Sequence, residues 1–326
     1  MRNNPFGEKG DFITAPNISI LFSEIIAIWC IAFWENLGCP KKINIVELGA
    51  GNGEMMHQMT KVFKKFEKFL KASKFFIFEK SHFLKKIQKK KITSCNVSWI
   101  SSLDNLKSGP NIFLANEFFD ALPINQYLKY KDAWYEKKVN FLSNGKIEYS
   151  NYKVNIKNIE KNVGYKVSKN QKILEISKTG IKFLKEISKL INKKNGGLLI
   201  IDYGYLEEKM KNTLRGMRNH KIVNILSNYK TCDITYSLSF NFLSMIAKQL
   251  NLHVSGITTQ GNFLKSLGIL KRAEIISKNL SFSKKADIYF RIEKLIDKKF
   301  MGDIFKVMLL TNSKINFKIG FPTDKI

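Results

Sequence analysis

The sequence predicts an α/β fold in which helices cover both faces of a doubly wound, mostly parallel β-sheet. Four short apolar segments, residues 43–48, 75–78, 97–100 and 112–115, alternate with segments of helical or loop pattern, as in sheets built from strand–helix–strand units. A glycine-rich turn at 49–53 follows the first of these strands directly. With 326 residues, 44% of them hydrophobic, the chain can bury the core that this fold needs.

Capping residues and apolar spacing assign the N-terminal elements in order. After a loop at 7–17, a helix is expected at about 18–37, capped by Asn17 or Ser19 and ended by Gly38 and Pro40. Two further helices are expected at about 54–71 and 81–90, between the first three strands.

The second half of the chain changes pattern. Alternating aromatic and charged residues around an Asn144-Gly145 turn predict antiparallel hairpin strands at 127–152. The remaining expectations are a helix at 171–192, a fifth core strand at 198–201, an irregular stretch at 203–233, a helix at 238–250, and strands at 253–258 and 305–310. We expect a single domain, 1–326, made of an N-terminal loop and helix (1–40), a ligand-binding half (41–124), an insertion (125–195) and a C-terminal half (196–326).

Lysine dominates the charge of the chain. There are 55 Lys+Arg against 27 Asp+Glu, a formal net charge of +28, and five of the basic residues are arginines, which leaves 50 lysines. Surfaces that bind nucleic-acid phosphates usually use the bidentate fork of arginine. Because the lysines are spread along the whole chain, we interpret the charge as compositional drift and expect no nucleic-acid partner.

Other patterns exclude further classes of protein. The four cysteines have no CxxC spacing, which disfavours a disulfide framework or a zinc cluster, and the histidines have no metal-binding spacing, so no metal is assigned. The most apolar stretch, 25–34, is too short to span a bilayer, and no targeting segment is visible. We expect a cytoplasmic, bacterial protein without stable membrane insertion, and a homodimer stays open.

The sequence VELGAGNG, residues 46–53, gives the strongest local signal for a ligand. Gly49, Gly51 and Gly53 leave backbone positions that a ligand can approach closely. A dinucleotide fingerprint places its third glycine three residues after the second, whereas here it follows after two. Glu47 would repel a pyrophosphate but suits a cationic or amine-bearing ligand. The turn therefore favours S-adenosylmethionine over a dinucleotide.

Two further acidic residues lie where the rest of that ligand would be bound. Glu79 ends the second strand, where a carboxylate can accept hydrogen bonds from both hydroxyls of a ribose. Asp104 follows the third strand and is a candidate acceptor for an adenine amino group, although a loop aspartate is as often a cap.

The segment NEFFDALP, residues 116–123, follows the fourth strand at the carboxyl edge of the sheet, where open α/β folds bind ligands. Together with the glycine turn it belongs to a series of motifs that resembles the MidA-like family of class I S-adenosylmethionine-dependent methyltransferases. The motifs are GDFITAPNIS (10–19), VELGAGNG (46–53), NEFFDALP (116–123), IDYGY (201–205), TLRGMRNH (213–220), DIT (233–235) and TQGNFL (259–264). The resemblance covers nearly the whole chain, but Asn17 stands where the family commonly has a glutamate.

The resemblance implies a seven-stranded, Rossmann-like methyltransferase sheet and a protein arginine methyltransferase. It also implies a role in assembly of respiratory complex I, with the homologue of its 49-kDa subunit as the protein substrate. Because a guanidinium stays protonated, carboxylates are needed to orient it and to take up a proton. The expected catalytic residues are Glu117, Asp120 and Asp202. The expected cofactor-binding residues are Glu47, Gly49, Gly51, Gly53, Glu79, Asp104 and Asn116, and the expected substrate-binding residues are Asp11, Phe118, Phe119, Tyr203 and His220.

Two alternatives stay open from the sequence. One is a non-catalytic complex I assembly chaperone that keeps a vestigial cofactor fold, which the intact set of glycines and Glu79 disfavours. The other is a methyltransferase acting on RNA or on a small molecule. An RNA substrate would predict an arginine- and aromatic-rich patch, and the sequence does not contain one.

Overall fold

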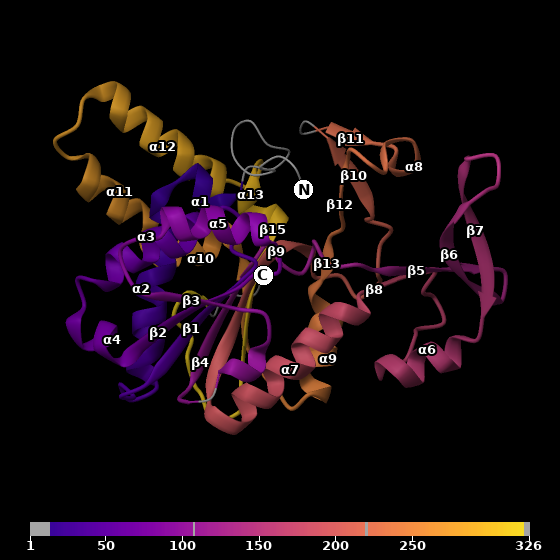
Figure 1. Cartoon of the computed structure of the whole chain (residues 1–326), viewed down its shortest axis with the longest axis horizontal. Coiled ribbons are helices and arrows are strands. Elements are labelled where there is room, and N and C mark those ends of the chain that lie inside the picture. The colour runs from indigo at the N-terminus through magenta and orange to yellow at the C-terminus, as the bar shows by residue number, and fades with distance from the viewer. Residues whose placement is uncertain (1–13, 107, 219–220, 323–326) are drawn as a thin grey trace.

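The computed structural model describes residues 14–106, 108–218 and 221–322. Figure 1 shows a central sheet enclosed by helices, with a second, antiparallel sheet projecting to one side. The strands are β1 (Ile43–Leu48), β2 (Ser73–Phe78), β3 (Val97–Ile100), β4 (Asn111–Asn116), β5 (Asn125–Tyr130), β6 (Ala133–Phe141), β7 (Ile147–Val154), β8 (Ile173–Ile176), β9 (Gly196–Tyr205), β10 (Arg215–Arg218), β11 (Lys221–Val223), β12 (Asp233–Thr235), β13 (Leu238–Ser239), β14 (His253–Thr259) and β15 (Phe305–Thr311).

The central sheet has the strand order β14-β15-β9-β4-β1-β2-β3, and the short β13 pairs with the end of β9. The pairings from β9 to β3 are parallel, and β15 runs antiparallel to both of its neighbours. This confirms the predicted mostly parallel sheet, with the seven strands of this order and β13 as an eighth. The strand order reverses between β4 and β1. In such sheets, ligands bind at the carboxyl ends of the strands at this switch point.

Helices cover both faces of this sheet. They are α1 (Ala15–Ile18), α2 (Ile20–Asn36), α3 (Glu54–Phe63), α4 (Glu67–Ala72), α5 (His82–Lys91), α6 (Ile156–Val163), α7 (Lys178–Lys194), α8 (Ile225–Asn228), α9 (Phe240–Gln249), α10 (Gln260–Ser266), α11 (Ile269–Ser277), α12 (Phe282–Ile296) and α13 (Met301–Ile304), with a 3₁₀ turn at Leu103–Asn105. One hydrophobic core lies between the sheet and α2, α3, α10 and α12. The other lies between the sheet and α7 and α9.

The predicted helix at 18–37 is confirmed as α2, with Ser19 as its cap: the Ser19 hydroxyl accepts from the backbone N–H of Leu21. The helix is apolar around most of its circumference because it is enclosed by neighbouring helices. Trp29 stacks on Phe33 with ring centroids 5.4 Å apart and meets Phe317 edge-on at 5.5 Å. In the described ranges, no helix combines the length and the apolar character that crossing a bilayer demands.

Three of the predicted segments were wrong. The helix expected at 54–71 is interrupted at 64–66 and forms α3 and α4. The helix expected at 171–192 begins only at Lys178, because residues 173–176 form β8 and pair with β5, and Ser177 then caps α7. The stretch 203–233, expected to be irregular, contains the end of β9, a three-stranded antiparallel sheet of order β11-β10-β12, and α8.

The predicted hairpin is part of a four-stranded antiparallel sheet of order β7-β6-β5-β8. This sheet and α6 project away from the central sheet (Figure 1). Within the segment predicted as an insertion, 125–195, α7 instead packs against the central sheet, where Phe183 meets Phe78 and Phe118 edge-on. The division of the chain into one domain stays a prediction.

Candidate cofactor and acceptor site

The glycine-rich turn has the backbone conformation that its sequence predicts. Gly49, Gly51 and Gly53 have φ values of 68°, 54° and 79°, in the left-handed region that side chains disfavour. Gly53 precedes the first residue of α3. A Cβ on Gly49 would come within 2.9 Å of the Phe118 ring. The turn therefore leaves no room for a side chain at Gly49.

Glu47 is a buried carboxylate at the end of β1, 3% exposed. Burial, with a smaller contribution from the charge of Glu79, raises the pKa of Glu47 to about 8, against a backbone hydrogen bond from Met56 that lowers it. Among the described residues, Glu47 Oε2 has no hydrogen-bond partner. A cationic amine would stabilise the charged form of this carboxylate.

Glu79 is held in place by two hydrogen bonds. Its Oε1 accepts from the backbone N–H of Ser81 at 2.8 Å, and its Oε2 accepts from Gln88 Nε2 at 3.1 Å. The same Gln88 amide donates to the carbonyl of Gly51 at 2.8 Å, and Gln88 Oε1 accepts from Trp99 Nε1. Gln88 thus links Glu79, the residue predicted to bind the ribose, to the glycine turn.

A pocket open to solvent lies between the glycine turn, α1 and the end of β4. Asn116, with an Oδ1 atom that lacks a partner in the described part of the chain, and Glu117 line it from β4. On the opposite side, Asn52 Nδ2 donates to Asn17 Oδ1 at 2.8 Å and so joins the turn to α1. The glycine cradle, the unpaired acceptors and the acidic lining fit S-adenosylmethionine with its cationic amino-acid group. Asp104 lies apart on the exposed 3₁₀ turn, where it accepts from the Ser102 hydroxyl.

The three predicted catalytic carboxylates come together at the ends of β4 and β9. Glu117 takes a left-handed φ of 50°, and this strained conformation directs the chain sharply out of β4. Asp202 is fully buried: its Oδ2 accepts from the backbone N–H groups of Phe119 and Asp120, and its Oδ1 accepts from that of Tyr203. The Thr235 hydroxyl donates to Asp120 Oδ2 at 2.9 Å.

Burial shifts the acidities of all three groups in the same direction. Burial and the charge of Asp120 raise the pKa of Glu117 to about 8. Burial raises the pKa of Asp120 to about 6, against the hydrogen bond from Thr235. Burial and the charges of Asp120 and Glu117 hold the pKa of Asp202 well above its usual range. The cluster therefore carries fewer negative charges than three carboxylates would in water, and a bound cation would favour the charged forms.

The predicted substrate-binding residues lie in different surroundings. Phe118 packs over Gly49, and both Phe118 and Phe119 belong to the buried core between the sheet and α7 and α9. Tyr203 is half-buried at the end of β9, with its ring 4.1 Å from that of Phe305. Asp11 and His220 lie outside the described residues. The individual roles of these residues stay predictions.

Sequence reasoning gave no role to Gln88 or Thr235. Gln88 is fully buried and follows Leu84 by one helical turn on the inner face of α5, so a polar residue on an otherwise apolar face was the available signal. Thr235 belongs to the quoted motif DIT, but the motif gives no indication that its hydroxyl contacts Asp120. In the described ranges, no group of three or more His, Cys, Asp or Glu side chains has a metal-binding arrangement.

A family model matches residues 25–258, more than half of the chain, and is described as "Putative S-adenosyl-L-methionine-dependent methyltransferase". The chain belongs to this MidA-like methyltransferase family. Its cofactor is S-adenosylmethionine, for which the cavity beside the glycine turn has the matching lining.

Relatives and solved structures agree with this assignment. The methyltransferase is 30% identical to "Protein arginine methyltransferase NDUFAF7, mitochondrial" of Xenopus tropicalis, over 85% of this chain and 69% of the relative. It is 28% identical to the protein of the same name from Homo sapiens, over 93% of this chain and 74% of the relative. A COG1565 superfamily member from Burkholderia thailandensis, solved with S-adenosyl-homocysteine, shares the fold with a TM-score of 0.79 and 19% identity, over 97% of this chain and 84% of that chain.

Proposed function

We propose that this methyltransferase transfers a methyl group to a guanidinium nitrogen of arginine in a protein. The observation that carries the proposal is the cluster of Glu117, Asp120 and Asp202 at the strand ends next to the cofactor cavity, with Glu117 in the wall of that cavity. The names of the curated relatives support arginine as the acceptor.

The roles proposed for the cofactor-binding residues follow from their chemistry. Glu47 binds the amino group of S-adenosylmethionine, because its Oε2 receives no hydrogen bond from the described residues. The backbone of the glycine turn allows close approach of the amino-acid part. Glu79 accepts from the ribose hydroxyls, and Asn116 offers an unpaired Oδ1 at the cavity wall. Asp104 remains the candidate for the adenine amino group.

When bound, S-adenosylmethionine supplies an electrophilic methyl group. Glu117 then orients the acceptor guanidinium by charge-assisted hydrogen bonds, and orientation supplies much of the rate in an in-line displacement. The cation lowers the pKa of Glu117 from about 8, so the carboxylate is charged when arginine is bound. As the nitrogen is methylated it loses a proton, which Glu117 or Asp120 accepts; their raised pKa values make them better bases than ordinary carboxylates.

Asp202 has a different proposed role from the other two acids. Its oxygens already accept three backbone N–H groups, and its side chain is fully buried. We therefore propose that Asp202 is a positioning residue. It fixes the turn that carries Phe119 and Asp120, whereas Glu117 lies in the cavity wall, where it can meet the acceptor.

The proposed protein substrate is the homologue of the 49-kDa subunit of complex I, as the family resemblance implies. The test is to incubate purified protein with radiolabelled S-adenosylmethionine and this subunit, and to locate the label by mass spectrometry. We expect methylation of an arginine, and none with Glu117→Gln. Label on RNA or a metabolite, removed by nuclease or by filtration but not by protease, would contradict the proposal.

A further inference from the structure

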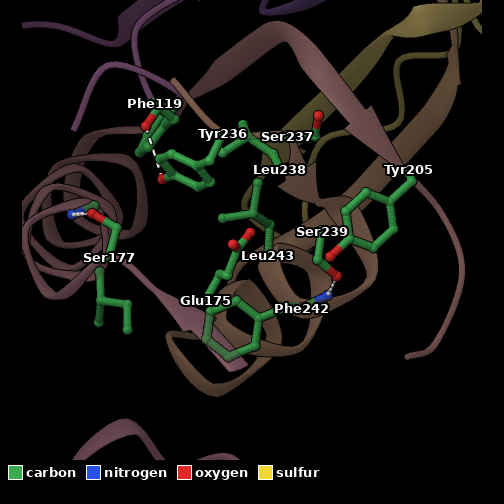
Figure 2. Close-up of a pocket in the computed structure, with 12 residues that line it drawn as sticks. Phe119, Glu175, Ser177, Tyr205, Tyr236, Ser237, Leu238, Ser239, Phe242 and Leu243 are labelled. Carbon is green, nitrogen blue, oxygen red and sulfur yellow. Dashed lines mark hydrogen bonds between the residues drawn. The ribbon is translucent and has the colours of Figure 1, made fainter. Parts of the chain in front are cut away.

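Glu175 is a buried carboxylate outside the cofactor cavity that collects hydrogen bonds from two distant parts of the chain. It lies on β8, is 7% exposed, and lines a second cavity together with Tyr205, Tyr236 and Phe242. Its Oε1 accepts from Gln126 Nε2 on the neighbouring strand β5 at 2.7 Å. Figure 2 shows the side chain among the aromatic residues of that cavity.

The other donors to Glu175 come from the segment that precedes β10. The backbone N–H groups of Thr213 and Leu214 donate to Oε1 at 3.0 and 3.1 Å, and the Thr213 hydroxyl donates to Oε2. Four donors therefore converge on one buried side chain, and a carboxylate is the side chain best able to accept them all.

Thr213 also binds the residue at the far end of the same segment, Ser237. Its Oγ1 accepts from the backbone N–H of Ser237 at 2.9 Å. Between these two residues the chain forms the β11-β10-β12 sheet, in which Arg215 lies opposite Thr235. We call residues 213–218 and 221–237 the strap. Glu175 holds its first end directly and its last end through Thr213.

The end of the strap contacts the turn that carries the proposed catalytic carboxylates. The Thr235 hydroxyl donates to Asp120 Oδ2 at 2.9 Å, and the Tyr236 hydroxyl donates to the carbonyl of Phe119 at 2.9 Å. The second of these bonds is visible in Figure 2. Thr235 and Tyr236 directly precede Ser237, the residue whose N–H is bound to Thr213.

We propose that Glu175 is a positioning residue for methyl transfer: it anchors the strap so that Thr235 and Tyr236 hold Asp120 and Phe119 in the geometry that the acceptor site needs. This inference rests on the proposed function for the role of Asp120. Glu175 itself does not touch the reacting atoms, because its oxygens are occupied by Gln126, Thr213 and Leu214.

The test compares Glu175→Ala and Glu175→Gln with the wild type in steady-state methylation and in amide hydrogen exchange. A displacement of about an ångström at Asp120 is expected to lower kcat by roughly 10²-fold in Glu175→Ala. The dissociation constant for S-adenosylmethionine should change by less than about threefold, because the glycine turn shares no contact with Glu175. Glu175→Gln should keep most of the activity, since its Oε1 can still accept three N–H groups and its amide can donate to Thr213.

The matched control is Glu160→Gln, which alters another carboxylate that accepts a backbone N–H, that of Val167 at 2.7 Å, in the same part of the chain but away from the strap. It should leave kcat unchanged. If Glu175→Ala does not fold, Thr213→Val removes the hydroxyl link alone and should lower kcat to a smaller degree.

The exchange measurement separates this inference from the proposed function. Faster exchange of the Thr213, Leu214 and Ser237 amides in Glu175→Ala is expected whatever the acceptor is, and the kinetics can be run on whichever acceptor the wild type methylates. Wild-type kcat or unchanged exchange in Glu175→Ala would overturn the inference. Equal losses in Glu175→Gln and Glu175→Ala would also overturn it, because they would mean that the charge acts directly.

Discussion

The hydroxyl of Thr235 lies 2.9 Å from the Asp120 carboxylate, although the two residues are separated by 115 positions in the sequence. The bond occupies Asp120 Oδ2, whereas Oδ1 has no partner in the part of the chain that the structure describes. One oxygen is thus fixed by Thr235, and the other is buried beside it. The same hydrogen bond opposes the effect of burial on the pKa of Asp120.

Replacing Thr235 by valine should shift the pH dependence of methyl transfer. Without the donor, the pKa of Asp120 rises further above about 6, because the charged form loses a hydrogen bond. A bond to a charged group contributes about 1.5–3 kcal/mol, which corresponds to roughly one to two pH units. The acidic limb of kcat against pH should move to higher pH by that amount. Thr258→Val is the matched control: Thr258 is 1% exposed, and its hydroxyl has no partner among the described residues. An unshifted limb in Thr235→Val would contradict the prediction.

Alanine at Gly49 should weaken cofactor binding more than its cost to stability explains. The left-handed φ of 68° costs a side chain about 1–2 kcal/mol, and the added Cβ would collide with Phe118 at 2.9 Å. Gly38→Ala is the control, because Gly38 has a φ of 81° with nothing within 4 Å of the added Cβ. Both variants should lose thermal stability, but only Gly49→Ala should lose affinity for S-adenosylmethionine in equilibrium dialysis. If Gly49→Ala and Gly38→Ala bound S-adenosylmethionine equally well, the cofactor would not bind at the glycine turn.

Removal of the Glu79 carboxylate should lower cofactor affinity about tenfold to a hundredfold. This range corresponds to the loss of charge-assisted hydrogen bonds to the ribose. Glu79→Ala is compared with Glu67→Ala, which removes an exposed glutamate that pairs with Lys71 on α4. Calorimetric titration with S-adenosylhomocysteine measures both. Wild-type affinity in Glu79→Ala would remove the residue from the cofactor site.

The central sheet could be predicted from the sequence because its signals are short-range. Each of the first four strands is a run of apolar residues ended by a turn, and the positions of β1 and β3 match the expected ranges. The glycine turn carries its own conformational requirement. The conformation of the glycine turn could therefore be predicted from adjacent residues.

The parts that could not be predicted depend on contacts between distant segments. Residues 173–176 have an apolar pattern that fits a helix as well as a strand, and pairing with β5 decides for the strand. Nothing near Thr235 or Glu175 in the sequence indicates their partners, which lie 115 and 38 positions away. The residue pattern of one segment does not show which distant residue its side chains will contact.

The buried Glu47 should make the protein less stable as the pH rises. Its folded pKa is about 8 against an ordinary value of 4.5, so the folded state holds a proton that the unfolded state releases. The stabilising contribution is complete below about pH 4.5 and is lost as the pH rises through about 8. The limiting slope for one proton is about 1.4 kcal/mol per pH unit. Glu47→Gln should match the wild type at low pH and exceed its unfolding temperature at pH 9, as measured by thermal denaturation without cofactor. Parallel curves for the two proteins would show that Glu47 titrates normally.

Replacing Glu117 or Asp120 by the isosteric amide should slow arginine methylation and leave cofactor binding nearly intact. Each amide preserves the shape of the turn but removes a charge that orients the guanidinium and a base that accepts its proton. Loss of one such interaction in the transition state costs about 2–4 kcal/mol, so kcat should fall by roughly 10²–10³. Mass spectrometry of the acceptor protein should show methylated arginine with the wild type and little with Glu117→Gln or Asp120→Asn.

The control for these two variants is Glu136→Gln, which changes a carboxylate that accepts from Asn125 on the projecting sheet at 2.8 Å and lies outside the cofactor cavity. It should methylate at the wild-type rate. Because Glu117 lines the cavity and Asp120 is held behind it by Thr235, the loss should be larger in Glu117→Gln. Unchanged methylation in both variants would exclude the two carboxylates from catalysis. A loss caused by weaker cofactor binding, seen as a raised dissociation constant with normal kcat, would move Glu117 from the acceptor site to the cofactor site.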